Sequence, residues 1–145
     1  MRVDFYQLSR DPAEAALPLI ARKVLSDGGR LLVVHGEEDR RARISRALWS
    51  LGPDTFLANG LDGEGHEARQ PILLSDRPEP ANGAGFLAIA DGIWRESETP
   101  FARTFFLFDE TTVQHARETW RALKGRDGGE LFYWKQEGGR WVQAG

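Results

Sequence analysis

The sequence predicts an α/β fold with a largely parallel central sheet flanked by helices, and two observations lead to it. Short apolar runs alternate with amphipathic segments along the chain, as in proteins built from strand–helix–strand units. One run, Arg30–His35, is almost continuously apolar, as expected of a strand covered on both faces. The 145 residues include no cysteine, which excludes disulfides, a thiol nucleophile and cysteine metal sites. We therefore expect a single domain, residues 1–145, with a C-terminal hairpin.

The first strand and helix are predicted before residue 30. Val3–Leu8 alternates enough to be a strand. Asp11-Pro12 then opens a helix whose apolar positions recur at helical spacing, and Gly28-Gly29 ends it. Pro18 is tolerated if this helix begins near Glu14, because the amides of a first turn have no intrahelical partner.

A second helix, Glu37–Leu51, is predicted after the apolar strand. Acidic residues begin it and arginines follow, which is the order that the helix dipole favours. Trp49 lies about 100° around the helix from Leu48, a member of the apolar stripe, and therefore points away from that stripe. Two interpretations stay open: the segment Asp54–Phe56 covers Trp49, or Trp49 anchors a partner.

The second half of the chain is predicted to contain more strands and a last helix. Leu57–Gln70 is rich in glycine and polar residues and is predicted to be a loop. The elements that follow are the strands Pro71–Ser75, Phe86–Ala90 and Phe105–Phe108, the helix Asp109–Lys124, and a hairpin of Leu131–Gln136 and Arg140–Gln143.

Charge and motifs argue against several classes of function. The net charge is −3, from 19 basic and 22 acidic residues, so general electrostatic binding to nucleic acid is not expected. Gly63-x-Gly65-x-x-Ala68 matches a dinucleotide fingerprint in its letters, but Pro71 follows too soon for the helix that the fingerprint requires. The sequence has no P-loop and no serine-nucleophile elbow. We expect no catalytic and no cofactor-binding residues.

Metal and membrane binding are not expected either. The three histidines lie in different predicted elements, without partners at metal-ligand spacing, so no metal site is predicted. No apolar run approaches the ~18 residues of a membrane span, and the N-terminus does not have the pattern of a secretory signal. We therefore expect a cytoplasmic protein.

The last helix carries the most informative surface pattern. Its helical spacing places on one face the residues Val113, Arg117, Trp120, Arg121 and Lys124. One interpretation is a core tryptophan beside solvated arginines. The alternative is a basic and aromatic cleft for an acidic peptide, because aromatic residues and arginines dominate binding hot spots.

Six segments in order carry a resemblance to a known family: Phe5-Tyr6-Gln7-Leu8, Gly29–Val33, Ala47-Leu48-Trp49 with Phe56, Gly60–Gly65, Gln70–Leu74 and Ala116–Arg121. With these segments the chain resembles, over nearly its whole length, the chi subunit of bacterial DNA polymerase III. The resemblance implies a Rossmann-like fold without nucleotide binding and a non-catalytic accessory subunit of the clamp-loader complex. The alternative from another class is a small nucleotide-binding enzyme on the same fold.

The resemblance also implies two interaction sites. Arg117, Trp120 and Arg121 match the residues that capture the acidic C-terminal tail of single-stranded-DNA-binding protein, and the family often has a basic residue at the position of Val113. Trp49 and Phe56 match a separate face that binds the psi subunit or another clamp-loader or helicase partner. DNA would be contacted only indirectly.

Overall fold

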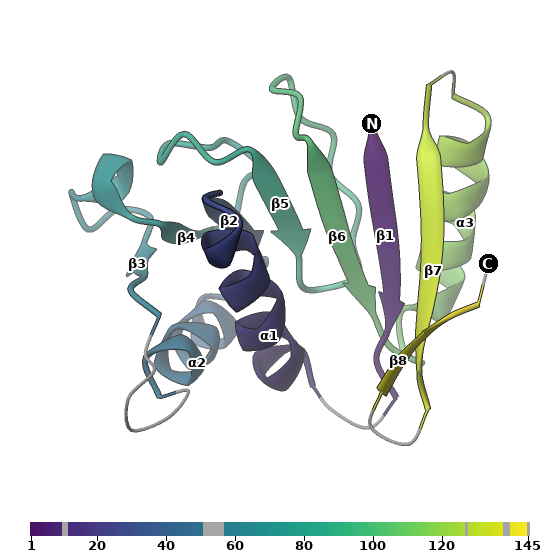
Figure 1. Cartoon of the computed structure of the whole chain (residues 1–145), viewed down its shortest axis with the longest axis horizontal. Coiled ribbons are helices and arrows are strands. Elements are labelled where there is room, and N and C mark those ends of the chain that lie inside the picture. The colour runs from purple at the N-terminus through teal and green to yellow at the C-terminus, as the bar shows by residue number, and fades with distance from the viewer. Residues whose placement is uncertain (10–11, 51–56, 127, 138–139, 145) are drawn as a thin grey trace.

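The strands join into one sheet in the computed structural model, which describes residues 1–9, 12–50, 57–126, 128–137 and 140–144 (Figure 1). The strands are β1 (Arg2–Gln7), β2 (Leu31–Val34), β3 (Gly60–Leu61), β4 (Ile72–Ser75), β5 (Phe86–Ile89), β6 (Arg103–Phe108), β7 (Glu130–Glu137) and β8 (Arg140–Gln143). The helices are α1 (Ala13–Ser26), α2 (Glu38–Trp49), α3 (Val113–Lys124) and the single 3-10 turn η1 (Glu67–Arg69).

The strand order is β3-β4-β2-β5-β6-β1-β7-β8. All neighbouring strands pair in parallel except β7 and β8, which form the antiparallel C-terminal hairpin. The predicted fold class is therefore confirmed. β2 lies between β4 and β5, and its four residues, Leu31–Val34, are each 0% exposed, as its apolar run predicts for a strand covered on both faces.

Helices cover both faces of the sheet. Residues of α1 and α2 pack in one core, which includes Leu17, Ile44 and Tyr6, and residues of α3 pack in a second core, which includes Ala116 and Phe5. Tyr6 and Phe5 belong to different cores because successive side chains of a strand point to opposite faces. In Figure 1, α1 crosses in front of the sheet and α3 lies behind β7.

Three details differ from the sequence-based expectations. The last helix begins at Val113 rather than Asp109, because the Asp109 carboxylate accepts the amide hydrogens of Thr111 (2.9 Å) and Thr112 (3.2 Å) and so forms a turn before the helix. The helix α1 begins at Ala13, close to the predicted start, but Pro18 is its sixth residue and so lies in the second turn, where it leaves one backbone carbonyl without its helical partner.

The third difference is in the predicted loop 57–70, which contains the short strand β3 and the turn η1. A strand of two residues is too short to show an alternating pattern, so periodicity cannot reveal it. Among the described residues, no helix is long and apolar enough to cross a membrane.

Candidate functional site

A cavity of about 300 Å³ lies between α3 and the strands β1 and β7. Its walls are formed by Phe5, Gln7, Phe108, Val113, Ala116, Arg117, Trp120, Arg121 and Tyr133. Four of the five residues singled out on the last helix therefore line one cavity. The fifth, Lys124, is exposed in the last turn of α3, outside the cavity wall.

The inner wall of this cavity is aromatic. Trp120 packs edge-on against Phe5, with 5.0 Å between ring centroids, and against Tyr133, with 6.4 Å. Phe108 contacts Tyr133 on the other side at 6.1 Å. Trp120 is half-buried: it packs against the α3-side core and also lines the cavity. It therefore has features of both interpretations, a core tryptophan and a residue of a binding cleft.

The rim of the cavity is cationic. Arg117 and Arg121 are exposed and one turn apart on α3. Neither takes part in any ion pair formed between the described residues. An arginine with no carboxylate partner can bind an external carboxylate through two parallel hydrogen bonds. The cavity is therefore suited to a ligand that is apolar at its end and anionic beside it.

Sequence reasoning missed the strand residues of the cavity, in particular Gln7 and Tyr133. The Tyr133 hydroxyl donates a hydrogen bond to Oε1 of Gln7. Arg117 and Tyr133 line the same cavity, and burial raises the pKa of Tyr133 while the positive charge of Arg117 acts in the opposite direction. These residues come together because β1 and β7 are neighbours, with Phe5 opposite Tyr133. No local sequence pattern reveals a pairing between the two ends of the chain.

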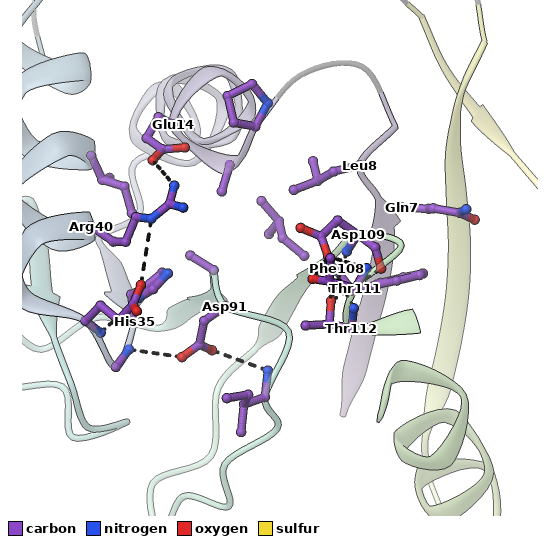
Figure 2. A pocket seen from close by; sticks show the side chains of 18 of the residues that line it. Gln7, Leu8, Glu14, His35, Arg40, Asp91, Phe108, Asp109, Thr111 and Thr112 are labelled. Carbon is purple, nitrogen blue, oxygen red and sulfur yellow. Dashed lines mark hydrogen bonds and ion pairs between the residues drawn. The ribbon is translucent and has the colours of Figure 1, made fainter. Parts of the chain in front are cut away.

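A larger cavity of about 760 Å³ lies at the carboxyl ends of β1, β2, β5 and β6 (Figure 2). Open parallel sheets commonly bind ligands at this edge. Here the charged side chains pair with one another: Arg40 binds Glu14 at 3.0 Å, and Arg95 binds Asp91 at 2.7 Å. Asp91 also accepts the amide hydrogen of Gly36 at 3.0 Å. Arg40 and Arg95, which could otherwise bind a phosphate, are therefore already bound to carboxylates of the protein.

The glycine-rich loop is also occupied by a side chain of the protein itself. The Glu67 carboxylate accepts hydrogen bonds from the amides of Gly63 (2.9 Å) and Gly65 (3.3 Å). These amides and that of Glu67 itself hold the pKa of this carboxyl below its ordinary value. In a dinucleotide-binding loop such amides face the phosphates instead.

Two of the three histidines, His35 and His115, have structural partners. His35 Nδ1 accepts the amide hydrogen of Glu37 at 3.0 Å, and burial lowers the pKa of His35 despite the nearby Asp91. His115 Nε2 accepts the amide hydrogen of Trp94 at 3.4 Å. Within the described residues, no group of three potential metal ligands occurs.

Trp49 is the last residue of α2 and is 47% exposed. Its predicted direction, away from the apolar stripe, is confirmed by the burial of Ile44 and Leu48 on the same helix. Its predicted companion, Phe56, and the segment Asp54–Phe56 lie outside the described residues.

Comparison with known proteins gives a family match. The model of the family described as "DNA polymerase III chi subunit, HolC" matches residues 1–129 of the 145. Residues 130–145, which contain β7 and β8, lie beyond the matched part. No curated protein matches the chain significantly.

Proposed function

Because the chain belongs to the DNA polymerase III chi subunit (HolC) family, we propose that it links the clamp-loader complex to single-stranded-DNA-binding protein. The family is one of polymerase accessory subunits, which fits a protein without catalytic residues of its own. The contact to single-stranded-DNA-binding protein is made through the acidic C-terminal tail of that protein, which ends in an apolar residue. DNA itself is reached only indirectly.

One observation carries this proposal: an aromatic cavity rimmed by two arginines that have no carboxylate partner among the described residues. The face of Trp120 offers apolar surface to the last side chain of the tail, and burying such a side chain contributes ~1.5–3 kcal/mol. Arg117 and Arg121 attract the carboxylates, at ~0.2–1 kcal/mol for each exposed ion pair. Because exposed ion pairs contribute so little, we expect a modest affinity, on the order of micromolar, that weakens in salt.

The proposal is tested by titrating the protein with a labelled acidic peptide that ends in phenylalanine. We expect saturable binding, and we expect its loss when the last residue is deleted while all acidic residues remain. Equal binding of the shortened peptide would show that the site is only a charged patch. Parallel titrations with ATP and oligo-dT separate the alternatives, because a nucleotide-using enzyme binds the first and a direct DNA-binding protein the second.

Substitutions in the cavity give the first prediction. Arg117→Ala should weaken peptide binding more than about tenfold, because the variant loses a charge-assisted carboxylate contact. Its melting temperature should stay unchanged, since Arg117 is exposed. Trp120→Ala should weaken binding as much but also lower stability, because Trp120 packs on Phe5. Arg22→Ala is the matched control: Arg22 is exposed on α1, on the opposite side of the sheet, and its loss should leave binding unchanged.

A second surface belongs to the same proposal. Trp49, exposed at the end of α2, and Phe56 bind the psi subunit or another clamp-loader or helicase partner. Trp49 belongs to α2, which packs on one face of the sheet, whereas the tail cavity lies on the α3 side. One subunit with contacts on both sides is suited to joining two proteins.

A further inference from the structure

The cavity beside α3 has a second wall, which is formed by β7. Leu131 and Tyr133 of this strand pack on the α3-side core. Because alternate residues of a strand share a face, Lys135 lies on the same side of the sheet as Tyr133, two residues further along β7. Lys135 is exposed, and it forms no ion pair with any residue that the structure describes. The strand thus presents an aromatic ring and an available cation side by side.

The pairing of β1 with β7 places Lys135 beside a residue that lines the cavity. Lys135 is the register partner of Gln7, and Gln7 lines the cavity and accepts the hydrogen bond of the Tyr133 hydroxyl. Arg117 lines the same cavity from α3. Arg117 and Tyr133 therefore line the cavity from the helix side and from the strand side, and Lys135 lies two residues beyond Tyr133 on β7.

We propose, on the basis of the tail-binding function above, that the peptide lies in the groove between α3 and β7, with its terminal carboxylate held between Arg117 and Lys135 and its terminal side chain against Tyr133. A carboxylate has two oxygens and gains most when donors reach it from more than one direction. A cation on each wall meets that need, whereas a site on α3 alone binds from one side.

The carboxylate contact is tested with two fluorescein-labelled peptides, Asp-Asp-Asp-Asp-Ala-Phe with a free C-terminal carboxylate and the same peptide with a C-terminal carboxamide. Lys135→Glu is compared with Lys23→Glu, which makes the same charge change at an exposed position of α1. We expect Lys135→Glu to weaken binding of the free acid about fivefold more than Lys23→Glu does. With the carboxamide, the two variants should agree within roughly twofold.

The aromatic contact is tested by the preference for a terminal phenylalanine over a terminal leucine. Tyr133→Leu keeps an apolar side chain in the core and should reduce this preference, whereas Tyr133→Phe keeps the ring and should retain it. If Lys135→Glu behaves like Lys23→Glu with both peptides, or if Tyr133→Leu keeps the full preference, the role of β7 is refuted while tail binding stands. Absence of binding by the unsubstituted protein overturns the proposed function itself.

Discussion

Asp91 follows the carboxyl end of the central strand β5, and its carboxylate connects this segment with the segment that follows β2. Arg95 donates two hydrogen bonds to it, at 2.8 and 2.7 Å, and the amide of Gly36 donates a third at 3.0 Å. Burial raises the pKa of Asp91, but the hydrogen bonds from Arg95 and Gly36 outweigh burial and hold the pKa below its ordinary value. The charged form therefore stabilises the fold.

This shift predicts how stability depends on pH. A carboxyl with a lowered pKa contributes stability that is present above its unfolded pKa, about 3.9, and is lost as the pH falls through the lower folded value. We therefore expect the free energy of unfolding of Asp91→Asn to fall less steeply below about pH 4 than that of the unsubstituted protein. Urea unfolding between pH 7 and about pH 2.5 measures this. Asp27→Asn, at an exposed position, is the control, and its free energy of unfolding should depend on pH as that of the unsubstituted protein does. If Asp91→Asn and the unsubstituted protein show the same pH dependence, the stabilising role of the Asp91 carboxylate is contradicted.

At the level of single residues, only part of the candidate site could be predicted from the sequence. Arg117 and Trp120 belong to one helix, so the helical period places them on one face without knowledge of the fold. Tyr133 and Gln7 reach the same cavity only because β1 and β7 pair. A cavity between elements distant in the chain depends on topology, which local spacing does not contain.

Among the elements, the connection from α1 to β2 shows how tightly helix and sheet approach each other. Gly28 has a φ of +83°, which favours glycine, and Gly29 follows it beside β5. A Cβ atom at Gly29 would lie 2.6 Å from the Phe86 ring and 3.2 Å from Val24. The second glycine is thus required by space rather than by backbone conformation.

Gly29→Ala should therefore destabilise the protein. The added methyl group must displace the Phe86 ring, and overpacking of this kind costs about 1–3 kcal/mol. Gly85→Ala is the matched control, because a Cβ atom there meets nothing within 4 Å and the backbone is not in the left-handed region. We expect chemical denaturation to show the loss for Gly29→Ala alone. Equal stability of the two variants would show that the ring moves aside without cost.

Most elements could be predicted because their patterns are long. β2 is recognisable from its unbroken apolar run, and α1 from apolar positions at helical spacing. The sequence pattern places the start of α3 too early, because Asp109 is compatible with a first helical turn. Its carboxylate instead accepts hydrogen bonds from the amides of Thr111 and Thr112. Such capping turns depend on side-chain geometry rather than on periodicity.

Over the whole molecule, the two proposed binding surfaces lie on different helices, and the cations of the peptide-binding surface lie on α3. The net charge of −3 disfavours general attraction to an acidic tail, so the cations must act locally, and α3 provides them at Arg117, Arg121 and Lys124. Trp49 belongs to α2, which packs on the other face of the sheet. The sheet thus lies between the two surfaces.

This separation predicts that the protein binds both partners at once. The affinity for an acidic peptide ending in phenylalanine should stay within roughly threefold when a saturating amount of clamp-loader complex from the same source is present, because no surface is shared. Arg117→Ala should lose the peptide and keep the clamp loader, and Trp49→Ala should do the reverse while remaining folded. Fluorescence anisotropy of the labelled peptide and pull-down of the clamp loader measure the two contacts independently. Competition between the partners, or loss of both contacts in either variant, would mean that the surfaces overlap and that the protein does not bridge them.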